Sequence, residues 1–184
     1  MRFADFLRTT VLMSAAAASA LAAVTLAGAV GGGHGRLVVP IAAVWWVASG
    51  FIGLWLGRRA ETSPPIATLL ASARSQASLP EVNPARVVLN RLWPLVFSTL
   101  AAGAIGVALP QVPAIAAGFA IIWALAWRRQ SRAVTAIEER DGARFYVERT
   151  SPLRPIQLIR TPGFRTNLME LNGASASRSA RPQV

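Results

Sequence analysis

Four long apolar stretches of this chain contain no charged residue, and arginines flank them almost entirely on one side. The stretches cover approximately Thr10–Gly33, Leu37–Gly57, Leu92–Leu109 and Val112–Trp127. A helix needs about 20 apolar residues, with a range of about 17–25, to cross the hydrocarbon core of a bilayer. The first two stretches meet this length, and the last two form a shorter, tighter pair. The pattern predicts an all-α membrane protein with four transmembrane helices.

The positions of the arginines predict how the chain is threaded. All 19 basic residues are arginine, and 18 of them fall on one side when four helices cross the membrane. Because basic residues are retained on the cytoplasmic side, we expect a multi-pass protein of the bacterial plasma membrane with both termini in the cytoplasm. Trp55, Trp93 and Trp127 lie beside arginines, as expected for indole rings at the inner interface.

This threading divides the chain into six segments. They are a cytoplasmic N-terminus (1–9), a first transmembrane hairpin (10–57), a cytoplasmic loop (58–91), a second transmembrane hairpin (92–127), a basic cytoplasmic segment (128–170) and a disordered tail (171–184). In the loop, apolar residues recur at helical spacing and predict a short amphipathic helix on the inner membrane surface. They are Ile66, Leu69, Leu70, Ala73 and Ala77.

Two proline motifs bound the second half of this loop. Leu79-Pro80 ends the surface helix, and Asn83 then caps a new helix that has Pro84 at its first position. We expect this new helix to continue through Arg86 and Arg91 into the third span, with a kink at Pro94 and with both arginines reaching the headgroups.

The N-terminus allows two interpretations. Arg2 and Arg8, followed by the apolar run Val11–Ala23 and the small residues Ala27-Gly28-Ala29, also match a secretory signal peptide. Cleavage there would leave three spans in the same orientation. The apolar run is longer than the core of about 7–15 residues that is usual for signal peptides, which favours a retained anchor.

The basic segment after the fourth span predicts a small C-terminal β-hairpin. Asp141-Gly142 lies between Ala133–Arg140 and Ala143–Arg149, and a type I′ turn favours this dipeptide. The competing interpretation extends the fourth helix through Ile137 before the turn. Because an isolated hairpin is marginally stable in water, it must pack on the surface helix, the membrane or another protein.

Small residues four positions apart predict close helix packing in lipid. Two such stripes lie in the second and third spans, and their residues are Ser49, Gly53, Gly57, Ser98, Ala102 and Gly106. They predict a compact bundle within one chain, or an interface with a partner subunit. Trp45 and Trp46 lie deep in the second span and need acceptors for their indole N–H groups, for which the Ser49 hydroxyl is a candidate.

The residues needed for catalysis are mostly missing. There is no cysteine, His34 is the only histidine, and no ionisable residue lies inside a span. These absences exclude thiolate metal sites and argue against a catalytic triad or an autonomous ion-coupled transporter. We therefore predict no catalytic, cofactor-binding or metal-binding residue and no cofactor, and we do not expect an enzyme.

The net charge of +11 indicates an anionic partner. For a chain held at a bilayer, that partner is the phospholipid headgroup, and no nucleic acid is expected. The arginines expected to contact headgroups are Arg58, Arg59, Arg86, Arg91, Arg128, Arg129 and Arg132.

The layout resembles that of small uncharacterised polytopic membrane proteins of GC-rich bacteria, actinobacteria in particular. The resemblance rests on the Ala/Gly-rich spans and on Trp127-Arg128-Arg129 leading to the sequence Glu138–Val147. It implies no activity.

These observations give one main hypothesis and two others. The chain is expected to be a non-enzymatic membrane protein that assembles with a membrane partner or with itself and contacts anionic lipid through its basic cytoplasmic face. A subunit of a transport or permeation complex is the alternative, and a lipid-modifying enzyme ranks last because no base or nucleophile is evident.

Overall fold

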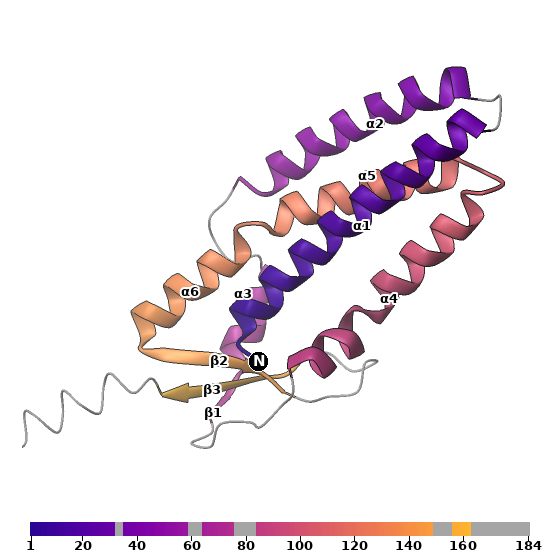
Figure 1. Ribbon diagram of the computed structural model, residues 1–184. Coiled ribbons are helices and arrows are strands. Elements are labelled where there is room, and N and C mark those ends of the chain that lie inside the picture. The colour runs from indigo at the N-terminus through magenta and orange to yellow at the C-terminus, as the bar shows by residue number, and fades with distance from the viewer. Residues whose placement is uncertain (32–34, 59–63, 76–83, 149–155, 163–184) are drawn as a thin grey trace, which may run out of the picture.

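The computed structural model describes residues 1–31, 35–58, 64–75, 84–148 and 156–162. Figure 1 shows a helical bundle with a small sheet at one end. The elements in chain order are α1 (Phe3–Gly31), α2 (Gly35–Leu56), α3 (Pro64–Ala71), β1 (Arg74–Ser75), α4 (Pro84–Ile105), α5 (Gln111–Trp127), α6 (Gln130–Asp141), β2 (Ala143–Val147) and β3 (Leu158–Pro162).

Four long helices form the bundle. α1, α2, α4 and α5 are each apolar, and the segments that contain them are long enough to cross a membrane. This confirms the prediction of four apolar helices and indicates a multi-pass membrane protein. We call the end that carries α3, α6 and the strands the sheet end, and the opposite end the far end (Figure 1).

α1 is longer than a bilayer requires. It begins at Phe3 rather than near Thr10, and its 29 residues measure about 43 Å at about 1.5 Å per residue. A hydrocarbon core is about 30 Å thick, so α1 is longer than one straight crossing requires. α4 likewise begins at Pro84 and runs as one helix past Pro94, as the sequence predicts.

The predicted hairpin around Asp141-Gly142 is wrong. Ala133–Arg140 belongs to α6, and Gly142, with φ 58° and ψ 25°, ends that helix by donating its N–H to the Glu138 carbonyl. A type I′ turn needs two residues with positive φ, whereas among the described residues no residue other than glycine has one. The competing interpretation, a fourth helix that extends through Ile137, is right that this segment is helical, but α5 ends at Trp127 and a separate helix, α6, begins at Gln130.

β2 instead pairs with a strand that the sequence did not predict. β3 lies between β1 and β2, antiparallel to β2 and parallel to β1. In the register, Phe145 is opposite Arg160 and Val147 is opposite Leu158. β2 alternates buried and exposed side chains, and the side chains of Ala143, Phe145 and Val147 are buried.

The sheet covers a core that four helices share. We call it the sheet-end core, and it consists of Phe3, Ala4, Phe6, Leu7, Ile66, Val87, Leu92, Val134, Phe145, Val147 and Leu158. Phe3, Val134 and Val147 are at most 1% exposed. The first two turns of α1 therefore form part of a packed core at the sheet end.

Polar contacts hold the N-terminus against β2. The Val147 N–H donates to the Met1 carbonyl at 3.1 Å, and Arg2 forms an isolated antiparallel bridge with Tyr146. The Arg2 guanidinium donates to Glu138 Oε2 at 3.1 Å, while Glu138 Oε1 accepts the Phe145 N–H at 2.9 Å. Glu138 is buried and links α6 to β2 and to Arg2, the residue before α1, whereas the predicted hairpin had it in a strand.

The predicted amphipathic helix is shorter than expected. α3 ends at Ala71, and Arg74–Ser75 forms β1. Ile66 is buried in the sheet-end core, with Leu69 and Leu70 partly buried against it. The apolar face of α3 thus packs on the protein itself. Ala77 and Leu79-Pro80, predicted to belong to this helix and to end it, lie outside the described residues.

Candidate functional site

The arginines gather at the sheet end of the bundle. This end carries all the arginines whose side chains the structure describes, which are Arg2, Arg8, Arg58, Arg74, Arg86, Arg91, Arg128, Arg129, Arg132, Arg140, Arg144 and Arg160. Arg36 lies in the first turn of α2 at the far end. The sheet end is therefore the candidate surface for an anionic ligand.

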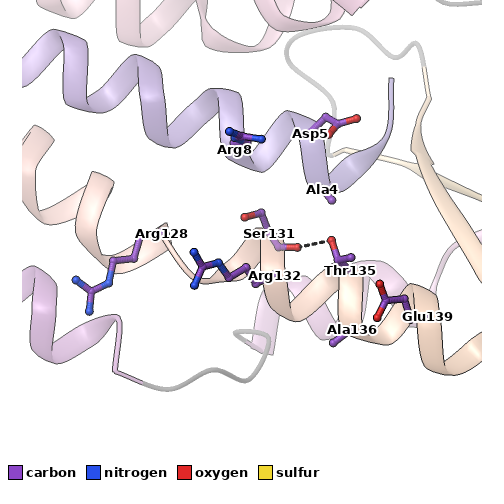
Figure 2. Close-up of a pocket in the computed structure, with 9 residues that line it drawn as sticks. All are labelled: Ala4, Asp5, Arg8, Arg128, Ser131, Arg132, Thr135, Ala136 and Glu139. Atoms are coloured by element: carbon purple, nitrogen blue, oxygen red, sulfur yellow. Dashed lines mark hydrogen bonds between the residues drawn. The ribbon is translucent and has the colours of Figure 1, made fainter.

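A groove between α1 and α6 opens on this surface. It has a volume of about 560 Å³ and is lined by Ala4, Asp5, Arg8, Arg128, Ser131, Arg132, Thr135, Ala136 and Glu139 (Figure 2). The two helices run in opposite directions, because α1 enters the bundle at the sheet end and α6 leaves it there (Figure 1). Ala4 and Ala136 add only methyl groups to the lining, which leaves space between the helices.

Positive and negative side chains lie toward opposite ends of the groove. Arg8 of α1 lies opposite Ser131 and Arg132 of α6, on the side nearer the spans (Figure 2). Asp5 and Glu139 lie at the other end, away from the spans (Figure 2). The groove thus has a basic half next to the membrane helices and an acidic half further out.

The groove arginines have no carboxylate partner in the part of the chain that the structure describes. The two ion pairs found there are Arg2–Glu138 and Arg140–Asp141, and neither lies in the groove. Arg8 and Arg132 are exposed, and Arg128 is partly buried directly after Trp127. Three cations without internal counter-charges at the end of a span can accept an external anion.

The predicted headgroup arginines fall into separate places on this surface. Arg128 and Arg132 line the groove. The Arg129 guanidinium donates to the Arg58 carbonyl at 2.9 Å, which ties the end of α5 to the end of α2.

Of the remaining arginines predicted to contact headgroups, two lie on α4 and one lies outside the residues that the structure describes. Arg86 lines a shallower hollow of about 290 Å³ with Leu89, Asn90 and Trp93. Arg91 is partly buried, and Arg59 lies outside the described residues.

Arg8 and Asp5 line the groove, although neither was predicted as a site residue and both lie in the segment 1–9 expected to be a cytoplasmic N-terminus. The available signal was helical periodicity. Phe3, Phe6 and Leu7 are buried and lie three and four positions apart, so Asp5 and Arg8 must lie on the opposite face of the same helix.

The first predicted packing stripe faces α5. A Cβ on Gly53 would lie 2.8 Å from Leu125 Cβ, and one on Gly57 would overlap the Leu125 carbonyl oxygen. Ser49 is fully buried, and its Oγ lies against Gly118. These three residues thus allow α2 and α5 to approach closely within the chain.

The second stripe is divided between two surroundings. Ala102 packs with Leu21 and Ala117 in a small cluster inside the bundle. A Cβ on Gly106 would lie 2.7 Å from Pro113 Cγ. Ser98 is exposed and donates its hydroxyl to the Leu95 carbonyl of its own helix at 3.0 Å.

The two deep tryptophans bond to backbone rather than to Ser49. Trp45 Nε1 donates to the Ile115 carbonyl at 3.2 Å, and Trp46 Nε1 donates to the Ala114 carbonyl at 2.9 Å. Gly118 makes room for this contact, because a Cβ there would overlap the Trp45 indole. Both rings fix α2 to the first turns of α5.

The described residues contain no group of three or more His, Cys, Asp or Glu side chains that could hold a metal ion. Comparisons of the chain with protein-family models, with curated proteins and with solved structures give no match.

Proposed function

We propose that this chain is a non-enzymatic integral membrane protein that contacts anionic phospholipid through the basic sheet end, which faces the cytoplasm of a bacterial cell. The gathering of the described arginines at one end supports this orientation, because basic residues are retained on the cytoplasmic side. Each basic residue near an anionic surface contributes about 1 kcal/mol of attraction.

The groove between α1 and α6 carries the proposal. It presents Arg8, Arg128 and Arg132, which have no carboxylate partner among the described residues. Trp123 and Trp127 pack against each other in the last turns of α5, just before Arg128, with tilted rings whose centroids are 5.4 Å apart. Indole rings favour the headgroup region of a bilayer. Arginine suits this role because its planar fork of donors binds phosphate oxygens two at a time.

A protein partner has less support. It was expected because of the small-residue stripes and the unsupported hairpin. The first stripe packs on α5, and β2 packs on α1 and α6 within the same chain. The outward faces carry apolar side chains that lipid tails suffice to cover, including Val44, Phe51, Phe97 and Leu100. Lipid contact is therefore the primary role in this proposal, and self-assembly is secondary.

The test is lipid retention in nanodiscs that contain phosphatidylglycerol and phosphatidylcholine. The wild-type protein is expected to retain phosphatidylglycerol in native mass spectrometry, and Arg8→Gln/Arg132→Gln is expected to lose most of it. Arg140→Gln/Arg144→Gln is the matched control, since it removes the same charge from exposed residues outside the groove. Equal loss in both double variants would show that net charge, not the groove, holds the lipid.

A further inference from the structure

The groove between α1 and α6 offers two opposite charges in a fixed order. Its basic half, with Arg8 and Arg132, lies next to the spans, and its acidic half, with Asp5 and Glu139, lies further from them (Figure 2). We propose that the groove binds the phosphoethanolamine group of an aminophospholipid, with the phosphate on the arginines and the ammonium on the carboxylates. This inference rests on one part of the proposed function, the contact of the groove arginines with a lipid phosphate, and adds a zwitterionic headgroup to the anionic lipids that the site accepts.

The order of charges matches the order of groups in such a lipid. In a bilayer the phosphate lies nearer the acyl chains, and the ammonium follows it toward water. On α1, Asp5 precedes Arg8 by three residues, which is about 4.5 Å along the helix axis. This is of the order that a two-carbon ethanolamine bridge spans. On α6, Glu139 lies seven residues beyond Arg132, about 10 Å along the helix axis, and it adds a second carboxylate to the outer half of the groove.

The chemistry of the lining selects a primary amine. An ammonium has three N–H donors, which carboxylates and hydroxyls such as that of Thr135 accept. A choline headgroup has no N–H donor, and proteins bind quaternary ammonium in aromatic cages. None of the residues that line the groove is aromatic. Phosphatidylethanolamine therefore fits the groove better than phosphatidylcholine.

The acidic half also disfavours purely anionic headgroups in the outer part of the groove. Asp5 and Glu139 are exposed and have no cationic partner among the described residues. A glycerol headgroup brings no cation to these carboxylates. Phosphatidylglycerol is therefore expected to bind through the arginines alone.

The experiment compares headgroups in nanodiscs by native mass spectrometry of the retained lipid. The lipids are phosphatidylethanolamine, its N,N-dimethyl form, phosphatidylcholine and phosphatidylglycerol, with identical acyl chains. The wild-type protein is expected to retain phosphatidylethanolamine about three- to tenfold better than phosphatidylcholine, the ratio that one charge-assisted hydrogen bond supports at an exposed site. The dimethyl form is expected to fall between them.

The decisive variant is Asp5→Asn/Glu139→Gln. Both residues are exposed, so folding is expected to survive the change. The preference for phosphatidylethanolamine is expected to vanish, while retention of phosphatidylglycerol stays equal or rises. Asp141→Asn is the matched control, because this exposed carboxylate on α6 lies outside the groove. It is expected to keep the preference.

Competition with free O-phosphoethanolamine identifies the source of the ligand. Displacement of the lipid at millimolar concentration would support the same chemistry with a soluble ligand, and no displacement would support the bilayer lipid. No headgroup preference in the wild-type protein would overturn the inference, even if anionic lipid is retained and the proposed function survives. No retention of any phospholipid by the groove would overturn both.

Discussion

The apolar spans and the sheet end are packed by different kinds of residue. Between α2 and α5 in the spans, the helices approach closely because Gly53, Gly57 and Gly118 have no side chain, and a Cβ at any of them would collide with the facing helix. At the sheet end, contact depends on large buried side chains such as Phe3, Phe145 and Ile66. The first region has the character of a membrane interface and the second that of a small soluble core.

This difference follows from the solvent around each region. Lipid tails are as apolar as leucine, so helices associate there through close packing and hydrogen bonds rather than by exclusion from water. At the sheet end, burying apolar area is worth about 25 cal/mol per Å². α1 belongs to both regions, because its first turns lie in the sheet-end core and the rest lies among the spans.

The largest loss of stability is expected from Phe3→Ala, which removes a buried side chain from the sheet-end core and leaves the spans unchanged. Phe3 is 1% exposed, and truncation of a buried phenylalanine costs about 3–5 kcal/mol. Limited proteolysis in detergent should show faster cutting near β2 and α6, with the spans still protected. Leu12→Ala, at an exposed position of the same helix, is the control and should behave as the wild type. Equal susceptibility of both variants would contradict a separate sheet-end core.

A smaller loss is expected from Glu138→Ala, which removes the link between Arg2, α6 and β2. The Phe145 N–H loses its acceptor and Arg2 loses its partner, which together cost about 2–3 kcal/mol. Glu138→Gln keeps an oxygen for the Phe145 N–H and should recover part of this loss. Thermal unfolding followed by tryptophan fluorescence measures both variants. Equal melting temperatures of the two variants would show that the hydrogen bond from the Phe145 N–H to residue 138 does not stabilise the fold.

Gly53→Ala tests the spans rather than the sheet end. The added methyl would lie 2.8 Å from Leu125 Cβ, and such overpacking costs about 1–3 kcal/mol. Gly50→Ala, on the same helix, meets nothing within 4 Å and should be neutral or stabilising by up to about 1 kcal/mol. The two variants are compared by thermal unfolding in the same detergent. If Gly50→Ala were the more damaging, the close contact of α2 with α5 would be wrong.

The smallest effect is expected at Asp141, on the surface of the sheet end. A hydrogen bond from Arg140 lowers the pKa of the Asp141 carboxyl below its ordinary value. A lowered pKa means that the pair stabilises the fold above the ordinary pKa, and the effect is lost as pH falls through the lowered one. Exposed pairs contribute little, so Asp141→Asn should leave the melting temperature unchanged between about pH 5 and pH 8. A pH-dependent shift in that range would contradict this.

The spans were predictable because their signal is local. Each is a run without charged residues, and length alone relates such a run to the bilayer. The strand Ala143–Val147 was also predictable, since Phe145 and Val147 alternate with Arg144 and Tyr146. Its partner was not. Both a hairpin turn and a helix end use glycine with positive φ, so Gly142 alone cannot distinguish them.

The groove was half predictable. Arg128 and Arg132 follow the fourth span directly, and their charge suggested a headgroup contact. Asp5 and Arg8 are more than 100 residues away in sequence. The docking of Met1 and Arg2 on β2, together with the packing of Phe3 in the sheet-end core, brings them opposite α6. Contacts between residues so far apart in sequence depend on how the side chains fit together, and a local sequence pattern cannot predict them.

The most direct test of this account is a cysteine crosslink between Arg2 and Tyr146. The two residues are bridge partners, so their Cα atoms should lie about 4.5–5.5 Å apart, within the range of a disulfide. The chain has no cysteine of its own, so Arg2→Cys/Tyr146→Cys gives no background. In oxidised membranes we expect most of the protein to yield the crosslinked peptide by mass spectrometry, far above an Arg2→Cys/Ala108→Cys control. Crosslinking no greater than in that control, or a chain that has lost residues 1–29, would contradict the shared sheet-end core and the groove that depends on it.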